Sequence, residues 1–229
     1  MIIRLRACRL VELLAAAAIA TPAMATQDSQ LWTNGTATVK LSDKWRVQED
    51  LTIRFSDKRN GLYEIESNTL LGLVVAKGVT LWAGYTHNPQ YAAGHFTIME
   101  QRAREQVTID NFAHLGNGRF NGRVRLEQRW RDGLHGTGWR LRPFVKYTLP
   151  FSKSGHTGLV LSVEPFINLN TTPFQRTNGL DRVRTFIGIG TPLLKNVTLE
   201  AGYLNQHTFV PNAPNNDDHV ASFSLSMSL

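Results

Sequence analysis

Residues 119–131 read RFNGRVRLEQRWR, and their side chains alternate between two chemical classes. The odd positions are mostly Arg, whereas the even positions include Phe120, Val124, Leu126 and Trp130. A period of two predicts a strand with one apolar and one ionic face. Ten residues lead from Phe120 to Trp130, which at about 3.3 Å each and a tilt near 45° span roughly 23 Å, close to the apolar band of a membrane barrel. The stretch therefore predicts a membrane-spanning strand with an aromatic side chain at each interface.

The same period continues through most of the chain. Eleven candidate strands follow one another, at 31–41, 45–56, 62–75, 79–88, 97–112, 119–131, 139–150, 158–170, 182–192, 196–208 and 219–229. Short turns alternate with longer loops, and we expect those loops at 56–61, 88–96, 132–138, 171–181 and 211–218. Short periplasmic turns and longer extracellular loops are typical of outer-membrane barrels. The predicted fold is an all-β, antiparallel transmembrane β-barrel of 10 to 12 strands.

The strand count of eleven conflicts with this fold, since a closed antiparallel barrel needs an even number of strands. We therefore expect ten or twelve, with the error near residues 26–41. The alternative is a soluble two-layer sandwich or a lipocalin-like barrel, which also alternates but buries its apolar face. Long strands and aromatics at the strand ends favour the membrane barrel.

The N-terminal residues have the features of a cleaved secretory signal peptide. Basic Arg4, Arg6 and Arg9 precede the apolar run Leu13–Ala20, and small residues precede a cleavage site after Ala25. We expect a signal peptide at 1–25 and the mature barrel at 26–229; the alternative is an N-terminal core helix. The single cysteine lies within that signal, so the mature chain would hold neither disulfides nor Cys-ligated metals.

Outward aromatic side chains are expected to form two membrane girdles. The girdle residues are Trp45, Phe55, Tyr63, Tyr85, Phe120, Trp130, Trp139, Tyr147 and Tyr203. Glu49 and Glu105 fall on the same outward face, where a charge is costly away from the interface. We therefore expect a β-bulge to shift the register at these two positions.

The last segment, 219–229, resembles the C-terminal strand recognised by the barrel-assembly machinery. Phe223, Leu225 and Met227 share one face and alternate with serines, although the chain ends in Leu229 rather than an aromatic. Further segments at 30–32, 41–45, 82–85, 125–130 and 141–143 read QLW, LSDKW, WAGY, RLEQRW and LRP.

Together these segments make the chain resemble a DUF2490-type family of uncharacterised Gram-negative outer-membrane β-barrel proteins, over nearly all of residues 26–229. The resemblance implies location in the outer membrane of a Gram-negative bacterium and carries no assigned activity. Expected partners are outer-membrane lipid, lipopolysaccharide, the assembly machinery and small anionic solutes.

The inward face predicts an arginine-rich lumen. By alternation its acids are Asp50, Glu64, Glu66, Glu100, Glu127, Glu164 and Glu200. Its bases are Arg46, Arg54, Arg102, Arg104, Arg119, Arg123, Arg125, Arg129, Arg131, Arg140, Arg142, Lys146, Arg182 and Arg184. These groups could form a structural ion-pair network, or the surplus Arg could bind carboxylate or phosphate.

Three functions follow in order of preference. The first is a narrow anion-preferring pore or a barrel that binds acidic solutes. The second is a plugged structural or lipopolysaccharide-interacting barrel, and the third is a hydrolase with its site in the loops. We expect no enzyme activity and no cofactor, because no nucleophile, base and orienting group converge. We interpret Asp217, Asp218 and His219 as the solvated start of a strand. The sequence contains no His-x-x-x-His spacing for a metal site. Its basic residues alternate along strands and do not indicate nucleic-acid binding.

Overall fold

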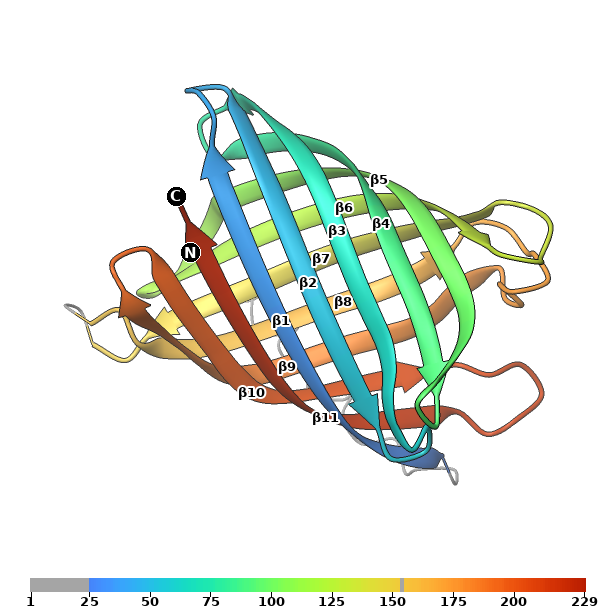
Figure 1. The fold of residues 1–229 in the computed structure, drawn as a ribbon. Helices are drawn as coiled ribbons and strands as arrows, with labels where there is room; N and C mark the ends of the chain where they lie inside the picture. Colours follow the sequence, from blue (N-terminus) through green and yellow to red (C-terminus); the bar gives the residue numbers. More distant parts are fainter. Residues whose placement is uncertain (1–24, 153–154) are drawn as a thin grey trace, which may run out of the picture.

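The structure, a computed structural model, describes residues 25–152 and 155–229, and within them eleven strands form one closed barrel without a helix (Figure 1). The strands are β1 (Thr26–Lys40), β2 (Trp45–Ser56), β3 (Gly61–Ala76), β4 (Val79–Ala92), β5 (His95–Leu115), β6 (Gly118–Arg131), β7 (Gly138–Pro150), β8 (Gly158–Asn168), β9 (Gly179–Leu194), β10 (Val197–Thr208) and β11 (Asn216–Ser228). Each predicted segment matches one of these strands. The predicted all-β barrel of ten to twelve strands is confirmed.

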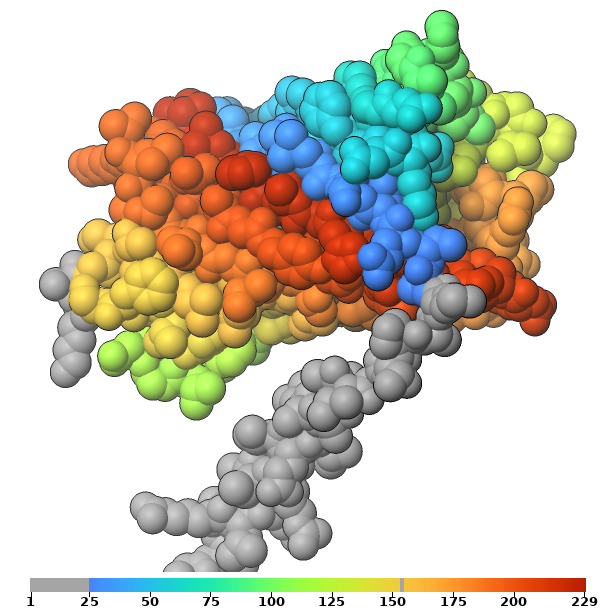
Figure 2. Space-filling model, turned by 90° about the horizontal axis from the view of Figure 1, so that it is seen from below, coloured from blue at the N-terminus to red at the C-terminus, as the bar shows by residue number. Residues whose placement is uncertain are grey.

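The barrel closes through a parallel pair. β1 lies beside β11 in parallel register, from Thr26 opposite Asn216 to Thr38 opposite Ser228. Figure 2 shows this seam as blue β1 against red β11. All other neighbours pair antiparallel and are consecutive in sequence. The expectation of an even strand number is therefore wrong, because one parallel pair lets an odd number of strands close.

The connections divide between the two ends of the barrel. The loop end carries 57–60, 93–94, 132–137, 169–178 and 209–215, and the turn end carries 41–44, 77–78, 116–117, 151–152 with 155–157, and 195–196. The prediction of a long loop at 88–96 is wrong. β4 and β5 extend to a two-residue turn in which Ala93 and Gly94 have φ of 50° and 77°, as a type I′ hairpin turn requires.

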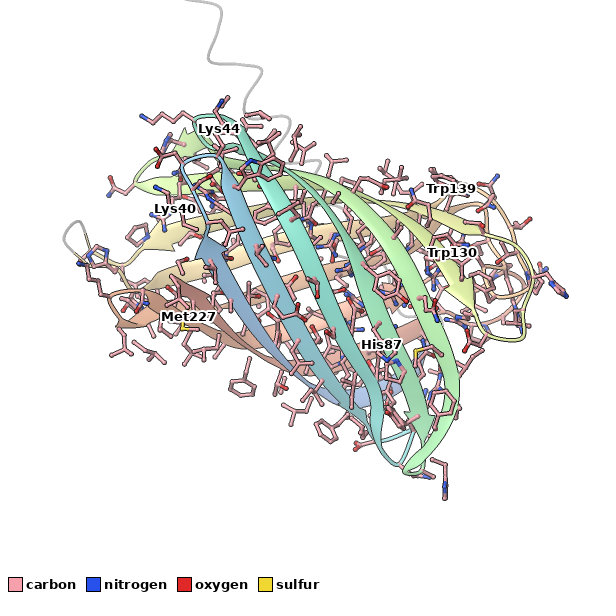
Figure 3. The ribbon with its side chains drawn as sticks, turned by 45° about the horizontal axis from the view of Figure 1, so that its top comes forward. Lys40, Lys44, His87, Trp130, Trp139 and Met227 are labelled. Carbon is pink, nitrogen blue, oxygen red and sulfur yellow. The ribbon has the colours of Figure 1, made fainter. Side chains whose placement is uncertain are left out.

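The predicted alternation holds along β6. Val124 is 50% exposed on the outer face, whereas Arg125, Glu127 and Arg129 are buried inside the barrel. Six of the expected girdle residues are exposed, namely Trp45, Phe55, Tyr85, Trp130, Trp139 and Tyr203. Figure 3 places Trp130 and Trp139 near the loop end and Lys40 and Lys44 at the turn end. In the described residues, no helix is long and apolar enough to cross a membrane.

Tyr63 does not belong to the outer girdle. The register between β2 and β3 shifts here, so that Phe55 pairs with Leu62 and Arg54 with Glu64. Tyr63 is the extra residue of this irregularity, and its hydroxyl donates to Gln30 Oε1 at 2.8 Å inside the barrel. Its assignment to the outer face is wrong because alternation along the sequence does not account for the extra residue.

Glu49 and Glu105 stay on the outer face in regular register, so the expected bulges are wrong. Each carboxylate is instead satisfied by side chains from neighbouring strands. Ser67 Oγ and Thr69 Oγ1 donate to Glu49 at 2.7 and 2.5 Å, and Gln128 Nε2 donates to Glu105 Oε2 at 2.9 Å. Polar neighbours, not a bulge, accommodate these two acids.

Candidate functional site

The middle of the lumen is filled by charged side chains that we call the ion layer. Its members are Glu66, Glu100, Glu127 and Glu164 with Arg102, Arg104, Arg140 and Arg142, all of them buried. They come from β3, β5, β6, β7 and β8, whose alternation directs every second side chain inward. Charged side chains from different strands therefore meet across the barrel.

Glu127 lies at the centre of the ion layer. Arg140 donates to its Oε2 through Nε and Nη2, at 2.8 and 2.5 Å, and Arg142 Nη1 donates to its Oε1 at 2.7 Å. Glu127 is 0% exposed, and Arg104, whose Nη2 lies 3.5 Å from the same carboxylate, is 1% exposed. Water thus has no access to these groups, and the layer blocks this part of the lumen.

The other carboxylates extend the network. Glu100 accepts hydrogen bonds from Arg102, Arg129 and Arg131 at 2.5–2.9 Å. Arg102 also donates to Glu66, at 3.0 Å. Because one Arg serves two acids, the pairs form a connected array, which fits the structural ion-pair network considered from sequence.

Glu164 joins β6, β7 and β9 to the layer. Arg142 Nη2 donates to its Oε1 at 2.9 Å, and Arg123 donates to the same oxygen. Arg184 Nη1 lies at 4.0 Å from the other oxygen. Lys146 pairs apart from the layer, with Glu200, nearer the turn end.

Above the ion layer, a vestibule opens at the loop end. It is a hollow of about 380 Å³. Among the described residues its basic lining is Arg54, Lys58, Arg59, Arg102, Arg129, Arg131, Arg140, Arg142, Arg182 and Arg184, against the acids Asp28, Glu64, Glu66 and Asp218. Ten basic and four acidic side chains line the vestibule. Glu100, Glu127 and Glu164, which lie behind this lining, pair with several of these Arg side chains, and the positive excess that remains attracts anions.

The floor of the vestibule contains a stack of guanidinium groups and aromatic rings. Arg184 lies between Trp32 and Phe166, with its Cζ 4.6 Å from each ring centroid. Arg54 covers Trp32 at 4.4 Å, and Arg142 covers Phe166 at 4.2 Å. Such contacts hold the guanidinium planes in place. The stack fixes the position of Arg184, whose Nε donates to Gln206 Oε1 at 2.8 Å.

Of the lumen residues expected from sequence, Arg102, Arg129, Arg140, Arg142, Arg182 and Arg184 meet at the vestibule. Arg104, Arg123 and Arg125 lie on its turn-end side. Trp32, Phe166, Asp28 and Asp218 also face the lumen, although they are not among the lumen residues predicted from sequence. All four have the inward, even-numbered position of their strands, so the alternation could have identified them.

The cluster 217–219 does not form an acid–base group. Asp217 Oδ1 lies 2.7 Å from His207 Nδ1, and His219 Nδ1 lies 2.6 Å from the Tyr203 hydroxyl. Asp218 instead accepts from Gln206 Nε2 at 2.5 Å, at the vestibule. No group of three metal-ligating side chains occurs in residues 25–152 and 155–229.

Comparison with known proteins gives a family but no activity. A family model described as "Protein of unknown function (DUF2490)" matches residues 29–217. An uncharacterised protein of Methylorubrum extorquens is 30% identical over 202 residues, which cover 87% of each chain. No solved structure matches the chain.

Proposed function

The chain belongs to the DUF2490 family of proteins of unknown function, and on that basis we propose a function from the geometry of its barrel. The protein is an outer-membrane β-barrel that is closed across its middle and binds acidic solutes in the vestibule at its loop end. The observation that carries the proposal is the excess of ten basic over four acidic side chains around the vestibule.

The outer face supports a membrane location. Large apolar side chains are exposed around the barrel, for example Leu71, Val124, Ile187 and Phe223 at 46–52%. Exposed aromatics lie at both ends, as in the interfacial girdles of membrane barrels. A soluble barrel would bury this apolar surface, because its exposure to water is unfavourable.

The ion layer supports binding over conduction. Glu100, Glu127 and Arg104 are at most 1% exposed, and several donors hold each of the two carboxylates. An ion crossing the lumen would have to displace these pairs, and breaking a buried pair costs about 3–5 kcal/mol. A plugged barrel with a binding vestibule therefore fits the geometry better than an open anion-preferring pore.

Within the vestibule, the positioned Arg side chains favour carboxylate or phosphate ligands. Arg182 and Arg184 come from β9, and Arg129 and Arg131 come from β6. A planar guanidinium group binds two oxygens of an oxyanion at once, and such charge-assisted bonds are stronger than neutral ones. A solute with two acidic groups could contact both strands.

The test measures succinate binding to the refolded protein by calorimetry. Arg182→Gln with Arg184→Gln should weaken binding at least about tenfold, since each charge-assisted hydrogen bond contributes about 1.5–3 kcal/mol. Lys40→Gln with Lys44→Gln removes the same charge at the turn end (Figure 3) and should leave binding unchanged. Equal weakening by both double variants, or the absence of binding, would contradict the proposal.

The closed lumen is tested separately in planar bilayers. We expect no ionic current through the intact protein. A stable anion-selective current would overturn the closed barrel and support the anion-preferring pore instead. The two measurements therefore distinguish a binding site from a conducting path.

A further inference from the structure

A second hollow lies on the turn-end side of the ion layer. It measures about 270 Å³, and we call it the turn-side hollow. Arg54, Arg104, Arg123, Arg125 and Arg142 line it, whereas its acids are Asp50 and Glu66. A water needs only about 10–15 Å³, so the hollow has room for a small anion together with water. Arg54, Glu66 and Arg142 also line the vestibule, whereas Arg104, Arg123 and Arg125 line only the turn-side hollow of the two.

Arg104 has unused donors at this hollow. Its Nη2 donates to Glu66 Oε1 at 2.7 Å. Its Nε and Nη1 atoms are buried and have no hydrogen-bond partner in the described residues, although the side chain is only 1% exposed. Buried polar groups in proteins nearly always have a partner, so Arg104 is an incompletely satisfied cation in the wall of the hollow.

Arg125 is a second cation with an incomplete set of partners. It is 5% exposed, and its Nε donates to the neutral amide oxygen of Gln106 at 2.8 Å. The carboxylate of Glu127 lies farther away, at 3.9 Å from Arg125 Nη1, and is already held by Arg140 and Arg142. The charge of Arg125 is therefore poorly compensated.

The remaining charges around the hollow do not supply this compensation. Glu66 accepts hydrogen bonds from both Arg102 and Arg104. Glu164 likewise pairs with both Arg123 and Arg142. Asp50 accepts a hydrogen bond from Gln48 Nε2 at 2.9 Å. Two acids thus face five guanidinium groups around this hollow.

We propose that the turn-side hollow binds a small oxyanion of the inorganic phosphate type between Arg104 and Arg125. An oxyanion offers several acceptor oxygens, which match the fork of a guanidinium group, whereas chloride offers a single centre. The ligand would accept hydrogen bonds from Arg125 and offset its charge together with that of Arg104. Because both Arg side chains are at most 5% exposed, water screens these interactions only weakly.

The experiment titrates inorganic phosphate into the full protein, refolded in detergent at constant chloride. Calorimetry gives the affinity, and the ¹⁵Nε–¹Hε signals of the arginines locate the ligand. We expect saturable binding that shifts the Arg104 and Arg125 signals. Chloride alone should not produce these shifts.

The decisive variant is Gln106→Glu, which keeps the shape and the acceptor of Arg125 Nε but adds a fixed carboxylate. The new carboxylate should pair with Arg125 in place of phosphate. The loss of one charge-assisted interaction should weaken phosphate binding about tenfold. Because the added acid faces an existing cation, this variant should fold even if Arg104→Gln does not. Asn121→Asp is the matched control: it adds the same charge on β6, near the turn end, and keeps the acceptor for Asn111 N at 3.0 Å.

Wild-type affinity in Gln106→Glu, or equal weakening in Asn121→Asp, would overturn the inference. Arg182→Gln, which lies at the vestibule and not at this hollow, should leave the phosphate-induced Arg104 shift unchanged. Loss of that shift in Arg182→Gln would assign the binding to the vestibule, against the proposal. The site can therefore fail independently of the proposed solute-binding function.

Discussion

At the scale of the residue, polar groups on the outer face are stabilised in pairs. Gln128 Nε2 donates to Glu105 Oε2 at 2.9 Å, and Gln128 is only 9% exposed. Alternation alone predicts that leucine at Gln128 is neutral or stabilising, since lipid prefers an apolar side chain. The hydrogen bond reverses this expectation, because its loss leaves a carboxylate without its amide partner on an apolar surface.

We therefore expect Gln128→Leu to destabilise the barrel by about 1–3 kcal/mol, the cost of an unsatisfied polar group. Adding Glu105→Leu should restore the stability or raise it. Urea unfolding in lipid vesicles measures both free energies, with Gln101→Leu, which faces outward on β5 opposite Trp130, as the control. If the double variant is less stable than Gln128→Leu, the hydrogen bond from Gln128 does not account for the stability of Glu105 on this face.

The sequence reveals the direction of a lumen side chain better than its partner. Alternation placed Glu127 and Arg140 inside, where the structure has them. Their contact depends on the register between β6 and β7, which sets Glu127 opposite Arg140. The choice among many similar Arg side chains depends on three-dimensional distances, so sequence could predict an ion-pair network but not the turn-side hollow.

At the scale of the element, the parallel pairing of β1 and β11 distinguishes this barrel from an all-antiparallel one. In that register Ala37 lies opposite Met227. Ala37→Cys with Met227→Cys, in a Cys8→Ser background, should form an intramolecular disulfide on mild oxidation, detected as a gel shift that a reductant reverses. Gly35→Cys with Met227→Cys is offset by two residues and should crosslink much less, since paired cysteines need Cα atoms about 4.4–6.8 Å apart. Preferential crosslinking of the offset pair would exclude the observed register.

Strand positions were predictable because each strand has a long alternating pattern bounded by turn residues. The pairing of the first and last strands was not, because parallel and antiparallel neighbours show the same alternation. The hairpin at Ala93–Gly94 was missed for a different reason. Pro89 before the turn and Gly94 within it are typical of loops, yet β4 continues to Ala92 through an irregular register at Gln90–Tyr91.

At the scale of the whole molecule, the apolar outer face predicts behaviour in cells. Expressed with its N-terminal segment in a Gram-negative host, the protein should fractionate with the outer membrane and begin at Thr26. The folded barrel should migrate differently on gels before and after boiling, because hydrogen-bonded barrels resist detergent at low temperature. N-terminal sequencing and cell fractionation check this; a soluble periplasmic species that retains Met1 would contradict it.

The odd strand count also limits how the chain can be rewired. β1 begins at the loop end and β11 ends at the turn end, so Thr26 and Leu229 lie at opposite mouths of the barrel. In a barrel with an even count, a short hairpin linker can join the two ends and the chain can be reopened elsewhere. Here such a linker would have to run the length of β1, about 50 Å for its 15 residues at about 3.3 Å each. The fold therefore excludes circular permutants made with a short linker, because the parallel pairing of β1 and β11 places the two chain ends at opposite mouths of the barrel.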